Sequence, residues 1–180
     1  MSASPRIVFS TFRSSNDPMF LAWARFLRSV ESAARYAERA NIAEQTVSET
    51  AARLSSGPVA SGACGIWRIL ASNNRELGRS ARAYTSFETA RTHVLRLRGS
   101  LDELSITAVT GGRPGMHGWY MSAKTSAVIT CGRWYGAAAS SAEASLATIE
   151  ALRDGIVSDV SRELSPPRRG EHASETDVIW

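Results

Sequence analysis

Arginines and aromatic residues gather in one stretch of the chain, and they have the clearest capacity for chemistry. Residues 66–99 hold seven arginines against two glutamates, whereas the charges of the other segments nearly cancel. Guanidinium groups bind phosphate and aromatic rings stack on bases, so this mixture on a sheet suits single-stranded nucleic acid. The candidate nucleic-acid-binding residues are the arginines of a predicted hairpin that also carries Trp67 and Tyr84: Arg68, Arg75, Arg79 and Arg82.

The position of Trp67 argues against that use. It alternates with Ile69 and Ala71 along the predicted strand, which places the indole on the face that packs into the core. A platform that stacks bases needs an exposed ring. A solvated basic surface over a tryptophan-anchored core is therefore the favoured interpretation.

Residues 118–125 approximate the phosphate-binding motif G-x-x-x-x-G-K-[ST]. Such a loop needs small residues, so that successive backbone N–H groups converge on phosphate, and a helix must follow it. Here the run Trp119–Met121 is bulky, Ala123 replaces the second glycine, and a turn and a strand-like segment follow. We therefore expect a hairpin strand at this position.

No other residue pattern points to catalysis or metal binding. The three histidines and two cysteines are scattered along the chain: His93, His117, His172, Cys64 and Cys131. Their spacing matches no metal site, and no G-x-S-x-G motif occurs. The sequence predicts no catalytic residue, metal or cofactor, and an enzyme ranks third among the function classes. The loop Gly111–Gly118 is where a ligand-covering loop would lie, but a plain connection between strands is favoured.

The composition is that of a globular protein. The 180 residues are 43% hydrophobic and 21% charged, with a net charge of +4, which excludes collagen-like, fully disordered and disulfide-scaffold classes. No run approaches the roughly 18 apolar residues that cross a bilayer, and no signal-peptide pattern is present. Two thiols without C-x-x-C spacing fit a reducing compartment. We expect a cytoplasmic protein with no membrane association.

Helical periodicity dominates the first third of the chain. Pro18, directly after Asp17, predicts a helix start. An apolar stripe then recurs every three or four residues, and it begins with the candidate partner-binding residues Phe20, Trp23 and Leu27. The phase slips near residue 41, so we expect two helices, about 18–40 and 42–55, with one bent helix as the alternative. The stripe has two uses: it covers the sheet in cis, or it pairs with another chain in trans.

After residue 65 one pattern occurs twice. Each copy has an alternating strand that starts at a tryptophan (Trp67, Trp119), a polar turn, a second short strand, a tyrosine (Tyr84, Tyr135) and a helix. One such unit has too little core to be stable alone, whereas two can bury each other's faces. The sequence therefore predicts a duplicated unit that shares one sheet.

The ends of the repeated unit are predicted from shorter signals. Each helix is expected to open on a capping box, Thr85–Glu88 in the first copy and Ser140–Glu143 in the second. A strand over Leu104–Val109 precedes the second copy. The corresponding strand before the first copy has two candidates, Arg6–Phe12 and Val59–Ala63.

The first copy resembles the YegP-like family of small bacterial domains of unknown function. The family pattern is an aromatic-led strand that ends in a small residue, an Asn-Gly turn, a strand that reaches Ser-x-x-Tyr-x-Ser, and a helix with Ala and Val on one face. The positions that fit are Ala71, Ser80, Tyr84, Ser86, Ala90 and Val94. Asn74 stands where the turn glycine is usual, and the second copy lacks the matching serine. The resemblance covers about residues 66–160 and implies paired ββα units, with no established activity and no functional residues.

These observations predict an α+β protein with two tandem ββα-type repeats that share an antiparallel sheet, preceded by an N-terminal helical arm. The expected parts are an arm over 1–62, a repeat domain over 63–164 (repeats at about 66–99 and 101–164) and a disordered tail over 165–180. The expected function is a protein-interaction or self-association module that pairs with a protein partner or a second copy through the arm. The alternative is weak, non-sequence-specific binding of single-stranded nucleic acid through the arginine-rich first repeat.

Overall fold

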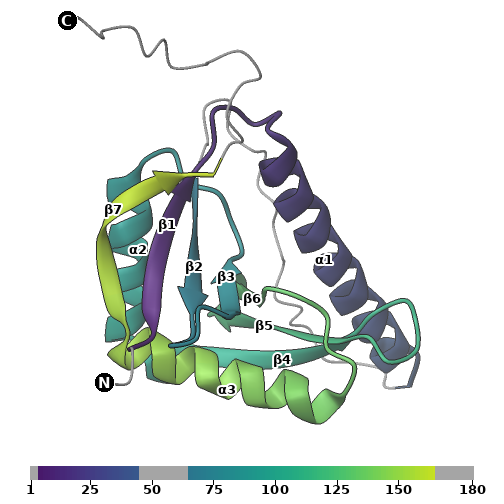
Figure 1. Cartoon of the computed structure of the whole chain (residues 1–180). Helices are drawn as coiled ribbons and strands as arrows, with labels where there is room; N and C mark the ends of the chain where they lie inside the picture. Colours follow the sequence, from purple (N-terminus) through teal and green to yellow (C-terminus); the bar gives the residue numbers. More distant parts are fainter. Residues whose placement is uncertain (1–3, 45–64, 165–180) are drawn as a thin grey trace, which may run out of the picture.

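The computed structural model describes residues 4–44 and 65–164 (Figure 1). The helices are α1 (Pro18–Glu44), α2 (Phe87–Gly99) and α3 (Ala138–Asp154), with a short 3-10 turn at Leu101–Glu103. The strands are β1 (Arg6–Thr11), β2 (Gly65–Leu70), β3 (Glu76–Ser80), β4 (Leu104–Thr110), β5 (His117–Ala123), β6 (Ser126–Cys131) and β7 (Ile156–Glu163).

All seven strands form one sheet, in the order β4-β5-β6-β3-β2-β1-β7. Neighbouring strands are antiparallel except β1 and β7, which run parallel. The predicted α+β class is thus confirmed. The two hairpins, β2–β3 and β5–β6, meet at the centre, where β3 pairs with β6.

Strand β1 belongs to this sheet, although it comes from the segment expected to be a helical arm. It pairs with β2 over six residues, from Arg6 opposite Leu70 to Thr11 opposite Gly65. Ile7 and Phe9 alternate into the core, as a half-buried strand requires. The segment Arg6–Phe12 therefore supplies the strand before β2, while Val59–Ala63 lies outside the described residues. A division at residue 62 would separate strands that are hydrogen-bonded to each other.

Helix α1 starts where the sequence predicts it. The Asp17 carboxylate accepts a hydrogen bond from the backbone N–H of Met19 (2.9 Å), and Pro18 occupies the first turn, where its missing N–H costs nothing. The sequence analysis expected this helix to end near residue 40. Instead, it continues through Asn41 to Glu44. An asparagine in a helix costs less than about 0.7 kcal/mol, too little to end one. Most of the second predicted helix, 42–55, lies outside the described residues.

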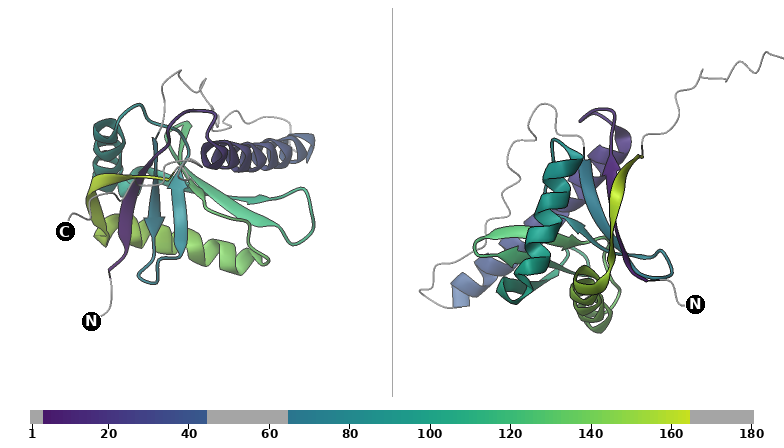
Figure 2. Two further views of the ribbon diagram at one scale, coloured as in Figure 1. Left: turned by 45° about the horizontal axis from the view of Figure 1, so that its top comes forward. Right: turned by 90° about the vertical axis from the view of Figure 1, so that its left-hand side faces the viewer.

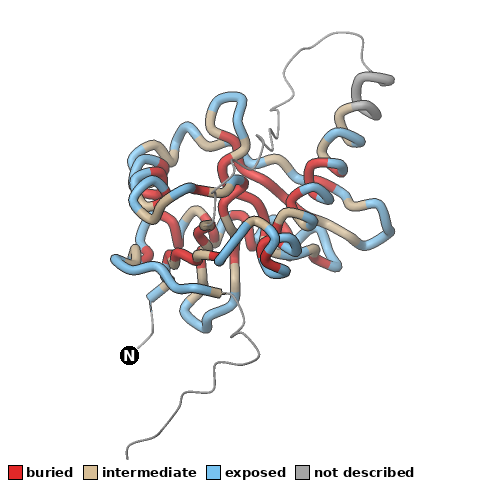
Figure 3. The backbone as a smooth tube through the Cα atoms, turned by 90° about the horizontal axis from the view of Figure 1, so that it is seen from above, coloured by how far each residue is buried: buried red, intermediate tan, exposed pale blue. Residues whose placement is uncertain are grey.

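The helices cover both faces of the sheet. Trp67 of β2 points toward α2, where it reaches the Tyr84–His93 pair, while its neighbour Ile66 packs on the other face with Phe20 of α1. Helix α3 packs against the same face as α2, since Thr148 of α3 lies over Gly78 of β3. Figure 2 shows α1 set apart from α2 and α3. The core lies between these layers, and Figure 3 shows its buried residues gathered in the central strands and the inner helix faces.

The turn and cap chemistry is partly as predicted. Both hairpin turns contain a residue in the left-handed region, Asn74 (φ 63°) and Lys124 (φ 56°), and a helix follows each tyrosine. The first helix has a capping box one residue later than expected, between Ser86 and Thr89. The capping box predicted at Ser140 is wrong: the N-cap of α3 is Ala137, three residues earlier, and no side chain among the described residues caps the helix. The preceding alanines have the highest helix propensity, so they extend the helix past that serine.

The sequence signals did not reveal β7. Most of its side chains are exposed, so it has no clear alternation of buried and exposed residues. It exists because it follows α3 directly and pairs in parallel with β1, with a register irregularity between Ile7 and Phe9. The predicted tail, 165–180, lies outside the described residues.

Candidate functional site

Two of the four candidate arginines meet on the α1 face of the sheet. Arg68 on β2 and Arg79 on β3 stand opposite each other in the strand register and share the carboxylate of Glu76. The Arg79 Nε donates to Glu76 Oε1, and Arg68 Nη1 lies 3.7 Å from Oε2. The side chains of Arg68, Arg79 and Glu76 are only 26%, 17% and 19% exposed, so this arginine cluster is largely covered by its neighbours.

The Arg79 side chain is held on two further sides. Its Nη2 donates to the carbonyl oxygen of Gly132 (3.1 Å), and its guanidinium lies 5.6 Å from the ring centroid of Phe26 on α1. This cation–π distance is within the range in which the ring attracts the charge. Helix α1 therefore covers one side of the arginine cluster.

The other two candidate arginines lie elsewhere. Arg75 is in the β2–β3 turn, and Arg82 follows β3, with its guanidinium 5.2 Å from the ring centroid of Tyr84. Trp67 and Tyr84 are 0% and 5% exposed, so neither ring can stack on a base. The structure thus does not gather the four arginines on one surface, and their binding to nucleic acid stays a prediction.

A buried polar network joins Trp67, Tyr84 and His93, and sequence reasoning missed it. The Trp67 Nε1–H donates to the Tyr84 hydroxyl (3.0 Å), and a hydrogen bond joins that hydroxyl to His93 Nδ1 (2.5 Å). Burial, with help from the nearby Arg82 and Arg96, lowers the pKa of His93 to about 4. Burial also raises the pKa of Tyr84. The sequence did carry a signal for the inward position of His93. It lies three residues after Ala90 and four before Leu97, so it belongs to the buried stripe of α2.

This network predicts a pH-dependent stability. The pKa of His93 is about 4 in the folded chain and near 6.5 when unfolded, so the unfolded chain binds more protons between these values. The free energy of unfolding should therefore fall by about 2–3 kcal/mol as pH drops from 6.5 to 4. The variant His93→Gln should show a smaller fall in urea titrations at matched pH values. Equal falls in both proteins would show that His93 is not the group responsible.

The candidate partner-binding residues are buried by their own chain. Phe20, Trp23 and Leu27 are 1%, 4% and 3% exposed, and they pack with Phe12, Ile66 and Ala81. This arrangement corresponds to the cis alternative. A partner could contact these three side chains only if α1 left the sheet.

The glycine-rich loop between β4 and β5 is a compact hairpin connection. The Gly111 N–H donates to the Met116 carbonyl (2.7 Å), and Gly115 has a left-handed φ of 73°. The Trp134 ring packs beneath it: a Cβ placed on Gly118 would come within 2.8 Å of that ring. The loop is thus closed by its own backbone bonds and by close packing.

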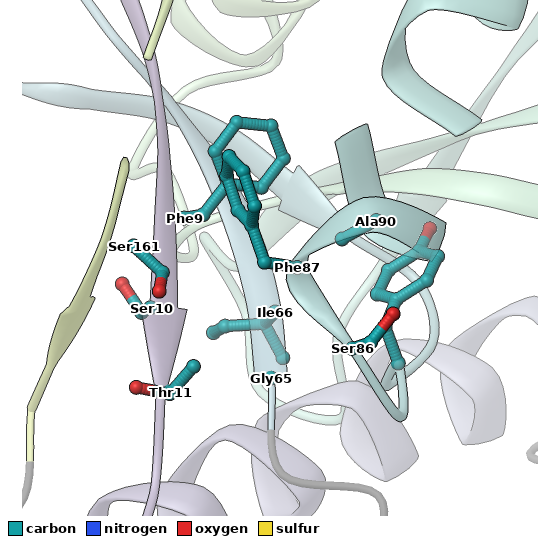
Figure 4. Close-up of a pocket in the computed structure, with 10 residues that line it drawn as sticks. Phe9, Ser10, Thr11, Gly65, Ile66, Ser86, Phe87, Ala90 and Ser161 are labelled. Atoms are coloured by element: carbon teal, nitrogen blue, oxygen red, sulfur yellow. The ribbon is translucent and has the colours of Figure 1, made fainter. Parts of the chain in front are cut away.

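One small cavity lies between β1, β2, α2 and β7 (Figure 4). Phe9 and Phe87 meet edge to face at its rim, with ring centroids 4.9 Å apart, and the hydroxyls of Ser10 and Ser161 lie on its strand side. Its volume of about 20 Å³ has room for about one water molecule. It is too small for a substrate.

The two edges of the sheet differ in chemistry. Strand β4 pairs with β5 over all seven of its residues without a register shift, and it contains no charged residue and no proline. Strand β7 has an irregular register and carries Asp159, Arg162 and Glu163, of which Glu163 pairs with Arg13. Charges and bulges are the devices that keep an edge strand from pairing with another chain. Edge β7 has them and edge β4 does not.

Within residues 4–44 and 65–164, no group of three or more His, Cys, Asp or Glu side chains could hold a metal ion. None of the helices described there is both long and apolar enough to span a bilayer. Comparison of the chain with protein-family models, with curated proteins and with solved structures finds no match.

Proposed function

We propose that this protein is a self-association module, in which two copies join through their β4 strands. The observation that carries this proposal is the free, uncharged and regular edge at β4. In the part of the chain that the structure describes, no strand pairs with the outer side of β4. The backbone N–H and C=O groups of alternate residues along that side are therefore available to a partner strand.

The side chains of β4 suit a strand partner. Its sequence, Leu-Ser-Ile-Thr-Ala-Val-Thr, is rich in β-branched residues, which favour strands. Ile106 is 39% exposed and Ala108 is exposed on the same face, so apolar surface lies beside the free backbone groups. An added strand would cover both.

A second copy of this chain is the partner that fits best. Two antiparallel β4 strands related by a two-fold axis present the same surface to each other, as closed dimers require. Because β4 has no charge, no like charges oppose each other in any register of that pairing. Seven residues span roughly 23 Å, which is enough for a continuous ladder across the interface.

Charge placed on β4 should separate the copies. In sedimentation experiments over a range of concentrations, the unmodified chain should show a concentration-dependent dimer. The double variant Ile106→Lys/Ala108→Lys brings like charges together across the two-fold axis, so its dimerisation should weaken by roughly tenfold or more. Both positions are exposed, so the monomer should keep its fold and its circular dichroism spectrum.

The matched control is Val160→Lys on the opposite edge. Val160 is 58% exposed on β7, so the substitution adds a charge to an edge strand without touching β4. It should leave dimerisation unchanged. The proposal fails if the unmodified chain stays monomeric at every concentration, or if the control variant dissociates as much as the double variant.

We also propose that the two halves of the sheet are tandem ββα copies, as the resemblance to the YegP-like family implies. Four paired features support this. Trp67 and Trp119 are both fully buried, and the first residue of each strand bridges to the following tyrosine, Gly65 to Tyr84 and His117 to Tyr135. An arginine two residues before each tyrosine lies over its ring, at 5.2 and 5.1 Å. Each hairpin turn has one left-handed residue.

A further inference from the structure

The arginine cluster on the α1 face holds more donors than its described neighbours satisfy. Arg68 Nη1 is 3.7 Å from Glu76, beyond hydrogen-bond distance, and Nη2 is 3.4 Å from the Ser10 hydroxyl, at the long limit. Its Nε is buried and has no hydrogen-bond partner among residues 4–44 and 65–164. A guanidinium has five N–H donors and binds best to planar, acceptor-rich groups. Arg68 therefore lacks the acceptor that its buried position requires.

A second buried polar atom lies without a partner in the same row. Thr130 of β6 stands opposite Arg79 in the strand register, and Arg79 stands opposite Arg68, so the three side chains share one sheet face. Thr130 is 0% exposed, and its Oγ1 has no hydrogen-bond partner in the part of the chain that the structure describes. Orphaned polar atoms are rare in folded proteins; six occur in the described part of the chain, and Arg68 Nε and Thr130 Oγ1 are the two on this row.

The charges of the arginine cluster are also unequal. Two guanidinium groups, of Arg68 and Arg79, face the one carboxylate of Glu76. Both arginines are more than 70% buried, so solvent compensates the extra positive charge only in part. An added oxyanion would make the charges of the cluster equal.

We propose that this arginine cluster binds a small oxyanion, a phosphate or carboxylate group, between Arg68 and Arg79. Glu76 lies against the same guanidinium groups and competes with the ligand for them. A single anionic group fits better than a nucleic-acid strand, because Arg75 and Arg82 lie elsewhere and Phe26 walls one side. A strand would need several phosphate contacts along one open surface. The inference is independent of self-association through β4.

Calorimetric titration of the full chain with inorganic phosphate, at constant ionic strength, tests this site. The unmodified chain should show saturable binding. Arg68→Gln should weaken it by roughly tenfold or more, because a charge-assisted pair is lost. Glu76→Gln should tighten it, because the competing carboxylate is neutralised. The control Arg153→Gln removes an exposed arginine of α3 and should have no effect.

Parallel titrations with acetate and with a short single-stranded oligonucleotide distinguish the sources of the anion. Tighter binding of acetate than of phosphate would assign the site to a carboxylate ligand. Tighter binding of the oligonucleotide, lost in Arg68→Gln, would overturn the small-anion assignment in favour of nucleic acid. The site itself is refuted if neither small anion binds saturably, or if Glu76→Gln binds phosphate no better than the unmodified chain. Glu76→Gln keeps the test decisive even if Arg68→Gln fails to fold.

Discussion

The variant Leu27→Ala should lose about 3 kcal/mol of unfolding free energy. Leu27 is 3% exposed and lies on α1 in a cluster with Phe12, Ile66 and Ala81, so truncation leaves a cavity under the helix. Buried leucines that become alanine typically cost 2–5 kcal/mol, about the value expected here. Urea unfolding followed by tryptophan fluorescence measures the loss as a lower midpoint at similar slope.

The matched control is Leu146→Ala on α3. Leu146 is 59% exposed, so the same change should alter stability by less than about 0.5 kcal/mol. Neither variant should change the number of subunits, because α1 packs in cis. If Leu27→Ala is as stable as the control but changes the subunit number, α1 pairs with another chain instead.

The variant Gly78→Ala should lose about 2 kcal/mol of unfolding free energy, although it adds only one methyl group. Gly78 lies at the centre of the sheet, on β3. A Cβ there would stand 2.9 Å from the Trp119 ring, 3.2 Å from the Thr130 carbonyl and 3.2 Å from the Thr148 methyl. Two of these are a backbone atom and a fully buried ring, which cannot move aside cheaply. Overpacking of this kind typically costs 1–3 kcal/mol, about the range expected.

The same substitution at Gly99 should have the opposite effect and raise the free energy of unfolding. Gly99 is the last residue of α2, and a Cβ there meets no atom within 4 Å. Alanine restricts the unfolded chain and favours the helix, so Gly99→Ala should gain roughly 0.4–1 kcal/mol. Thermal unfolding of the two variants side by side checks the contrast. Equal effects at both positions would mean that the close packing around Gly78 is not what the structure shows.

Local periodicity was enough to predict the hairpins and the helices that follow them. Trp67 and Ile69 share one face of β2, and Trp119 and Met121 share one face of β5, because successive side chains of a strand point to opposite faces. Stripes of period 3.6 located α1 and α2 for the same reason. The pattern of a single segment therefore carries the information on which of its faces is buried.

Pairing between distant segments could not be predicted in the same way. Strand β1 reaches the sheet across the 27 residues of α1, and β7 joins β1 from the other end of the chain. Nothing in the residues of β7 shows this, because most of its side chains are exposed. These pairings depend on how the whole chain folds back, which no local pattern records.

Only part of the candidate site could be predicted, because some of its residues come from a distant part of the sequence. The β2–β3 hairpin places Arg68 opposite Arg79, and both were among the predicted residues. This pairing follows from the register of a local hairpin, so it could be predicted from the sequence. The role of Glu76 between them was missed, and so was Thr130, since β6 pairs with β3 from a distant part of the sequence. Arg75 and Arg82 were grouped with these two arginines because they are close in sequence. In the structure, Arg75 lies in the β2–β3 turn and Arg82 follows the end of β3, away from Arg68 and Arg79.

Hydrogen exchange of the full chain at low and high protein concentration tests self-association through β4 most directly. The account predicts that the backbone amides of Leu104–Thr110 exchange more slowly at high concentration, while those of Ile156–Glu163 on the opposite edge do not change. Exchange at β4 that is independent of concentration, or slowing confined to β7, would contradict it.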